Sequence, residues 1–169
     1  MLLLFKMEEF RGFDTEFLHD VLKEIAADLP TLHITHVGSV DSWPQQQQQL
    51  ANAMLIFNTH YATQPGQHWF AVYITGSTAF LFDSMRLHRP FPQIVLSKLS
   101  QQCKKIINVV DDFALLQDPW SPMCGIHCLA FLERAAHRKT FELCNESYEM
   151  NDIIAFSVVL PYIKKVFRL

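Results

Sequence analysis

The sequence predicts an α+β fold in which helices flank a short, mostly antiparallel or mixed central sheet, formed as a single domain over residues 1–169. A chain of 169 residues is long enough for one domain with a full core and short for two. Half of the residues are hydrophobic and only 18% are charged, a balance typical of a globular protein rather than a disordered one. Short apolar runs bounded by turn residues, between longer segments of helical periodicity, indicate strands and helices in the same domain.

The first predicted helix covers residues 14–29, where apolar side chains recur at helical spacing. Asp14 or Thr15 is the expected N-cap of this helix. Pro30 is the expected stop, because proline cannot continue the backbone hydrogen bonding of a helix. Residues 32–37 then alternate between apolar and polar side chains, which predicts an edge strand.

Two apolar runs joined by Thr75-Gly76-Ser77 predict a β-hairpin, because glycine accepts the positive φ that tight turns need. The two runs cover residues 68–74 and 78–82. The other predicted elements are a buried strand at 51–58, a helix at 93–103, a strand at 105–110, a helix at 124–138 and a terminal helical segment at 147–167.

Composition and charge narrow the classes of protein to which the chain can belong. The net charge of −3 argues against general adsorption to nucleic acid. The apolar runs at 1–5 and 153–163 are too short for a signal peptide or a membrane span. The four cysteines have neither zinc-ribbon nor disulfide-framework spacing, which suits a reducing compartment. We therefore expect a soluble, intracellular monomer with no membrane partner.

Cys124 is the candidate nucleophile, because it opens a predicted helix directly after a proline-rich loop. Pro119 and Pro122 hold the preceding chain extended, since a residue before proline avoids the helical region. A thiol in the first turn of a helix meets free backbone N–H groups and the positive end of the helix dipole. Both features favour the thiolate, which is the reactive form of cysteine.

His68 and Asp83 are the candidate base and its orienting partner, since a cysteine nucleophile needs both. His68 opens the first strand of the predicted hairpin and Asp83 follows the second. In a tight antiparallel hairpin the start of one strand lies beside the end of the next. We therefore expect the imidazole and the carboxylate to be neighbours at one end of the sheet.

Gln117 is the candidate oxyanion donor, seven residues before the candidate nucleophile. Its side-chain amide can stabilise a developing oxyanion beside the backbone N–H of Cys124. Taken singly, each candidate has an ordinary structural alternative: a core histidine, a turn-capping aspartate, a buried cysteine or a loop glutamine. The joint arrangement favours catalysis. A metal site at Cys124, His127 and Cys128 has little support, because no second pair stands at zinc spacing.

These motifs resemble the adenovirus endopeptidase (adenain) family, which shares a cysteine-protease clan with the proteases of SUMO and ubiquitin-like proteins. The resemblance rests on His68-Trp69, Phe82-Asp83-Ser84, Gln117 and Cys124-Gly125 followed by an apolar helix. The resemblance covers roughly residues 15–135. It extends to the relatives of adenain that occur in adenovirus-like and Polinton-type elements. The family usually has a glycine shortly after Phe-Asp-Ser, where this chain has Met85-Arg86.

The resemblance implies the same roles for the four catalytic candidates and an adenain- or Ulp-like fold with the catalytic cysteine at a helix N-terminus. It also implies that Trp69 and Gly125 bind substrate, with Trp69 as the aromatic that flanks the catalytic histidine and shields the site. The ordinary alternative for Trp69 is a core aromatic. No cofactor is required for the chemistry.

The activity that the resemblance implies is a thiol endopeptidase that cuts viral precursor proteins next to small residues during particle maturation, in the host nucleus and the virion. The resemblance also implies two activators of this protease, a disulfide-linked peptide and DNA. Cys103 lies near the position of the peptide-linking cysteine, at a different distance from Gln117, and the acidic net charge weakens the case for DNA.

Two other functions stay open at this point. The first is removal of ubiquitin-like modifiers after a Gly-Gly tail, which would use the same active site. Such a tail needs a narrow aromatic tunnel, to which Trp69 and Trp120 could contribute. The second is a catalytically inactive binding module that retains the fold. The intact set of cysteine, histidine, aspartate and glutamine argues against that second alternative.

Overall fold

The computed structural model describes residues 13–43, 50–63, 68–85, 90–102, 108–110, 117, 121–138 and 151–169. Within these ranges the chain forms helices and strands in the alternation that the sequence predicts. In chain order they are α2 (Thr15–Ala26), β1 (His33–Ser39), the short 3₁₀ helix η1 (Val40–Ser42), β2 (Asn52–Asn58), β3 (Trp69–Thr75), β4 (Thr78–Phe82), α3 (Pro90–Gln102), β5 (Asn108–Val110), α4 (Cys124–Arg138) and α5 (Asp152–Phe167).

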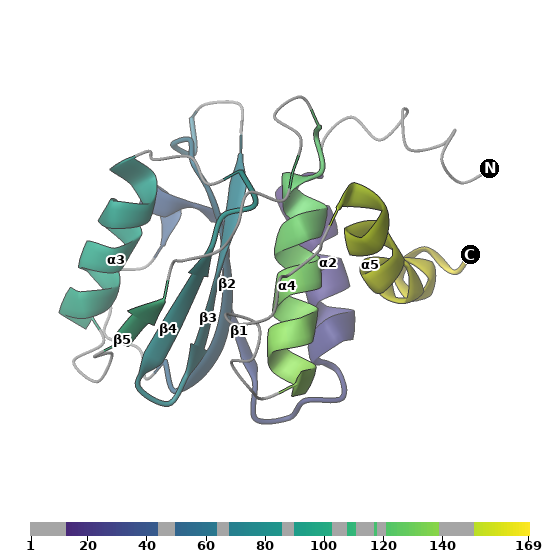
Figure 1. Ribbon diagram of the computed structural model, residues 1–169, viewed down its shortest axis with the longest axis horizontal. Helices are drawn as coiled ribbons and strands as arrows, with labels where there is room; N and C mark the ends of the chain where they lie inside the picture. The colour runs from purple at the N-terminus through teal and green to yellow at the C-terminus, as the bar shows by residue number, and fades with distance from the viewer. Residues whose placement is uncertain are drawn as a thin grey trace.

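The elements form three layers, with the sheet in the middle (Figure 1). Helix α3 covers one face of the sheet, while α2 and α4 cover the other, and α5 packs outside them. The predicted α+β class, with helices flanking a short central sheet and Cys124 at a helix N-terminus, is confirmed.

The sheet is five-stranded and mixed, in the order β1-β2-β3-β4-β5. The central pairs, β2 with β3 and β3 with β4, are antiparallel, whereas β1 and β5 pair in parallel with their neighbours. The β3–β4 hairpin turns at Gly76, whose φ of 57° is the positive value that the predicted turn requires. The predicted edge position of the first strand is also confirmed, since β1 is the end strand of this order.

Alternate side chains of the central strands belong to two separate hydrophobic cores, because successive residues of a strand point to opposite faces of the sheet. Met54, Ile56 and Phe82 face α2 and α4. Leu55 and Phe57 face the side that α3 covers. A strand that is buried on both faces reads as a continuous apolar run, which is why the sequence shows one at residues 53–57.

The first helix begins as predicted and ends earlier. The Asp14 carboxylate accepts the backbone N–H of Phe17 at 2.8 Å, so Asp14 is the N-cap. The helix ends at Ala26 instead of reaching residue 29, and two turns close before Leu32. A residue that precedes proline avoids the helical region, which accounts for an end before Pro30.

Helix α5 lies on the outside of the helical layer, although its apolar run predicts a core helix. One face of it is buried through Ala155, Val159 and Ile163, while Ile153 is 75% exposed. Pro161 lies inside the helix, which continues to Phe167. Among the described residues, no helix has the length and the apolar character needed to cross a bilayer.

Two contacts fix α4 against the rest of the molecule. The ring of Phe131 stacks on Phe82, the last residue of β4, with centroids 4.6 Å apart and planes within 5°. At its N-terminal end, α4 approaches α2 closely at Gly125. A Cβ added to Gly125 would lie 3.0 Å from Leu18 Cδ2 and 3.2 Å from Phe13 Cβ. The start of α4 is therefore held near the end of β4.

We expect Phe131→Ala to lower the free energy of unfolding by about 3–5 kcal/mol, because it removes a fully buried ring and leaves a cavity between α4 and the sheet. Denaturant unfolding would measure the loss. The control is Ile153→Ala, which truncates a 75% exposed side chain and should change stability by less than about 0.5 kcal/mol. Similar losses for both variants would contradict the packing described above.

Candidate active site

His68 and Asp83 lie together at one end of the β3–β4 hairpin. His68 precedes β3, Asp83 follows β4, and the register pairs Ala71 with Phe82 between them. His68 Nε2 lies 2.7 Å from Asp83 Oδ1, with the histidine 2% and the aspartate 10% exposed. The expectation that the hairpin makes these residues neighbours is confirmed, while their catalytic roles remain a prediction.

Backbone contacts hold this pair in place. The carbonyl of His68 accepts the N–H of Thr59, which continues the β2–β3 pairing one step beyond the strand ends. Asp83 Oδ1 also accepts the backbone N–H of Met85 at 3.0 Å. The carboxylate therefore receives a donor from its own turn, and its position does not depend on the imidazole alone.

Cys124 lies at the other side of the site, as the first residue of α4. It is 8% exposed and its thiol is free. The second ring nitrogen of His68, Nδ1, is buried without a hydrogen-bond partner of normal geometry among the described residues. Since Nε2 is occupied by Asp83, Nδ1 is the atom that can exchange a proton with the thiol. In ligand-free enzymes such contacts are often long and tighten when substrate binds.

The electrostatics of His68 support this proximity. Burial alone would lower the pKa of His68, but the hydrogen bond to Asp83 and the charge of its carboxylate, together with the nearby Cys124 sulfur, raise that pKa from 6.5 to about 9. The imidazolium form of His68 is thus favoured at neutral pH. By contrast, burial first and the charges of Cys124 and Asp83 next raise the pKa of Cys128, so the second cysteine of α4 stays a thiol.

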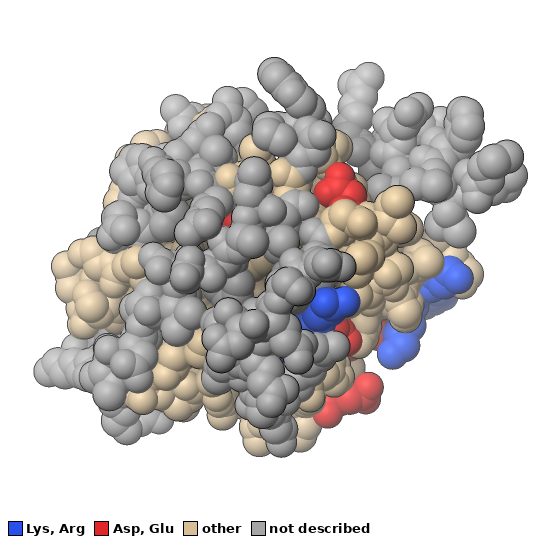
Figure 2. Space-filling view, in the orientation of Figure 1, with Lys and Arg blue, Asp and Glu red and all other residues tan. Residues whose placement is uncertain are grey.

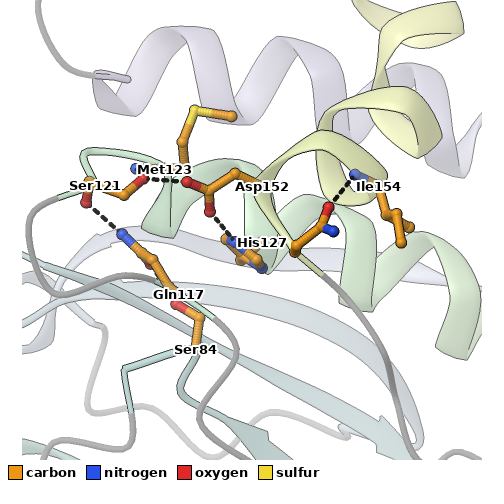
Figure 3. Close-up of polar contacts among 8 residues, drawn as sticks. Ser84, Gln117, Ser121, Met123, His127, Asp152 and Ile154 are labelled. Carbon is orange, nitrogen blue, oxygen red and sulfur yellow. Dashed lines mark hydrogen bonds and ion pairs between the residues drawn. The ribbon is translucent and has the colours of Figure 1, made fainter.

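Gln117 is buried beside Ser84, the residue after Asp83, and is held at both ends of its side chain (Figure 3). Its Oε1 accepts the hydroxyl of Ser84 at 2.7 Å, and its backbone N–H donates to the Ser84 carbonyl. Its Nε2 donates to the carbonyl of Ser121. Because an amide nitrogen carries two hydrogens, a second N–H of Gln117 remains to serve an oxyanion. The predicted oxyanion role stays a prediction.

The other predicted residues are placed as follows. Trp69 is half-buried and packs against the core beside His68, and whether it binds substrate is a prediction. Gly125 has a packing reason for lacking a side chain, the approach of Leu18, and its substrate role also stays a prediction. Cys128 is fully buried in the core. Cys103 and Trp120 lie outside the described residues.

No group of metal-ligating side chains occurs among the residues that the structure describes. On the face shown in Figure 2, the described Lys and Arg side chains are few and form no continuous patch. Activation by DNA or by a peptide therefore remains a prediction from the resemblance.

Comparison with solved structures identifies the fold. ChlaDub1 from Chlamydia trachomatis aligns over 93% of this chain and 92% of its own, with a TM-score of 0.57 and 11% identity. This chain has the fold of ChlaDub1. Two further matches are the C. trachomatis effector Cdu1 bound to ubiquitin (TM-score 0.48, 16% identity, 94% and 82% coverage) and a second structure of ChlaDUB1 (TM-score 0.46, 13% identity, 94% and 74% coverage).

Comparison of the sequence alone finds no relative, whereas comparison of structures does. No protein-family model matches the sequence, and no curated protein is significantly similar to it. An identity of 11% to ChlaDub1 establishes shared architecture and leaves activity to be argued from the site. The narrower resemblance to adenovirus endopeptidase stays a prediction.

Three polar residues of this region were missed by the sequence reasoning as parts of the site. His127 Nε2 lies 2.7 Å from Asp152 Oδ1, and Asp152 Oδ2 accepts the Ser121 hydroxyl at 2.6 Å (Figure 3). A histidine on the apolar face of a helix is a usable signal, since a buried imidazole needs a partner. The sequence offered no signal that this partner would be the first residue of α5.

We expect the His68 imidazole to titrate with a midpoint of about 9 in NMR spectra of its ring protons. Protonated His68 then stabilises the fold fully below pH 6.5, and that contribution is lost as the pH rises through about 9. Asp83→Asn should lower the midpoint, because it removes a carboxylate charge and a charge-assisted hydrogen bond.

The control for this titration is Asp20→Asn, which removes one carboxylate from the exposed Asp20–Lys23 pair of α2. That variant should leave the His68 midpoint unchanged. A midpoint of His68 that falls equally in both variants, or that lies near 6.5 in the wild type, would contradict the geometry described here.

Proposed function

We propose that this protein is a cysteine protease in which Cys124 is the nucleophile, His68 the general base, Asp83 the orienting carboxylate and Gln117 an oxyanion donor. One observation carries the proposal. A thiol at a helix N-terminus, an imidazole and a carboxylate converge at one end of the sheet, where His68 is hydrogen-bonded to Asp83 and its pKa is raised, against the effect of burial, by Asp83 and then by Cys124. That is the arrangement a thiol nucleophile needs.

Acylation requires the proton of the Cys124 thiol to be on His68 Nδ1, which either takes it when substrate binds or already holds it in an ion pair with the thiolate. The thiolate sulfur attacks the carbonyl carbon of the scissile amide and forms the tetrahedral intermediate. The imidazolium, which Asp83 holds in position through Nε2, then gives its proton to the leaving nitrogen. The C–N bond breaks, the amine leaves, and the acyl group remains on Cys124 as a thioester.

Deacylation repeats these steps with water. His68 takes a proton from the water, whose oxygen attacks the thioester carbonyl, and the sulfur leaves as the carboxylic acid forms. In both steps the negative oxygen lies where the backbone N–H groups of the first turn of α4 and the Gln117 amide can donate to it. The helix dipole of α4 adds to this stabilisation.

The substrate class that we propose is a protein with small residues before the scissile bond, as in the Gly-Gly tail of a ubiquitin-like modifier. The half-buried Trp69 next to His68 provides one apolar wall against which the two glycines of such a tail could pack. Cleavage of viral precursor proteins would use the same chemistry and is the second candidate, from the resemblance to adenovirus endopeptidase. Either activity fits a reducing compartment, which keeps the Cys124 thiol free.

The test compares wild type with Cys124→Ala on two substrate sets, fusions of ubiquitin-like modifiers carrying a reporter after Gly-Gly, and precursor proteins. We expect wild type to cut the modifier fusions, Cys124→Ala to lose at least about 10³-fold in kcat, and Gln117→Ala to lose about 10²–10³-fold. The matched control is Cys128→Ala, which removes the buried thiol one turn further along α4 and should retain activity.

Three results would count against the proposal in different ways. Equal cleavage by wild type and Cys124→Ala would overturn the nucleophile. Cleavage of precursors alone would move the substrate class to the second candidate. A thiol-reactive probe that labels no Cys124 in the folded protein, with no cleavage of either set, would favour an inactive binding module.

A further inference from the structure

Five residues form a polar chain from the end of β4 to the start of α5, in which Ser121 contributes its backbone carbonyl to one link and its hydroxyl to the next. We call it the oxyanion network; its members are Ser84, Gln117, Ser121, His127 and Asp152 (Figure 3). Ser84, Gln117 and His127 are almost fully buried. Buried polar groups are costly unless they are hydrogen-bonded, so each link constrains the next.

Ser121 is the residue through which the network reaches Gln117. Its carbonyl accepts the Gln117 Nε2–H. Its hydroxyl donates to Asp152 Oδ2 at 2.6 Å and accepts the N–H of Met123 at 3.3 Å. The two hydroxyl contacts fix the turn that leads into Cys124. They thereby fix the direction of the Ser121 carbonyl, which accepts the hydrogen bond from the Gln117 amide.

Asp152 is the only carboxylate in this network. Its Oδ1 accepts from His127 Nε2 and its Oδ2 from Ser121, so both oxygens are used within α4 and the turn before it. Burial lowers the pKa of His127 despite Asp152, and a neutral imidazole with its hydrogen on Nε2 satisfies the carboxylate. As the first residue of α5, Asp152 is anchored by a helix that packs on both α4 and α2.

We propose that Asp152 is a positioning residue for the oxyanion site. It holds Ser121, and Ser121 in turn takes one of the two N–H groups of the Gln117 amide. The plane of an amide fixes both of its N–H directions together, so the bond from one N–H to the Ser121 carbonyl also fixes the direction of the other. Ser84 completes the constraint at Oε1.

The inference rests on the proposed protease function, and it deepens that function by assigning α5 a part in the active site. Oxyanion donors act through preorganisation, and a donor misplaced in the free enzyme must be reoriented in the transition state. Loss of Asp152 should therefore affect the chemical step and leave ground-state substrate binding nearly unchanged.

The kinetic test uses Asp152→Ala, with Asn151→Ala as its matched control. The Asn151 side chain caps α5 by accepting the N–H of Ile154 at 3.0 Å, and within the described part of the chain it makes no hydrogen bond to a side chain of the network. Both variants weaken the start of α5, and only Asp152→Ala releases Ser121. We expect Asp152→Ala to lower kcat about 10- to 100-fold with little change in KM, and Asn151→Ala to retain the wild-type kcat.

Two further variants separate positioning from loss of structure. Asp152→Asn keeps the shape and one acceptor, so it should recover part of the activity that Asp152→Ala loses. Ser121→Ala removes the hydroxyl that Asp152 holds, so the double variant Ser121→Ala/Asp152→Ala should be no slower than the slower single variant. Additive losses, or equal losses in Asp152→Ala and Asn151→Ala, would overturn the proposal.

A second measurement does not depend on activity. The side-chain NH₂ signal of Gln117 in ¹⁵N NMR spectra, assigned by its absence in Gln117→Glu, should be protected from solvent exchange in wild type and in Asn151→Ala. In Asp152→Ala it should exchange like that of an exposed glutamine. An unchanged signal overturns the inference even where activity falls, and a wild type with no cleavage activity counts against the proposed function alone.

Discussion

The contact between α4 and the end of β4 is the constraint on which the site depends. Phe131 stacks on Phe82, the residue that precedes Asp83, while the close approach at Gly125 holds the other end of the same helix against Leu18. The helix that begins with Cys124 is therefore fixed relative to the strand end that carries the carboxylate. Apolar packing thus sets the positions of Cys124, His68 and Asp83 relative to one another.

The two His–Asp pairs of this region show how the surroundings decide the charge of an imidazole. In each pair a ring Nε2 lies 2.7 Å from a carboxylate oxygen, yet the pKa of His68 is raised and that of His127 is lowered. Asp83 is 10% exposed and a second partner, Cys124, adds its charge, whereas Asp152 is 35% exposed and more screened by water. One pair suits proton transfer, and the other suits a neutral scaffold.

The parts of the site that sequence could predict are those joined by short-range geometry. A two-residue turn at Gly76 fixes which residues of β3 and β4 are neighbours, so His68 and Asp83 could be placed together from their spacing alone. The parallel pairings of β1 with β2 and of β5 with β4 could not be predicted from the sequence, because they depend on how the intervening segments cross the sheet. The contact of Asp152 with Ser121 joins residues far apart in sequence and has no local signature.

Helix α5 shows why an outer element can matter to a site that it does not line. It buries only one face, exposes Ile153 and contains Pro161, so its contribution to the core is modest beside that of α4. Its first turn nevertheless supplies the carboxylate that satisfies the hydroxyl of Ser121 and the buried imidazole of His127. Without that carboxylate two polar groups at the start of α4 would lose their partner, and the cheapest relaxation available to them would move the turn that precedes Cys124. The position of the turn before Cys124 is in this way tied to the docking of α5.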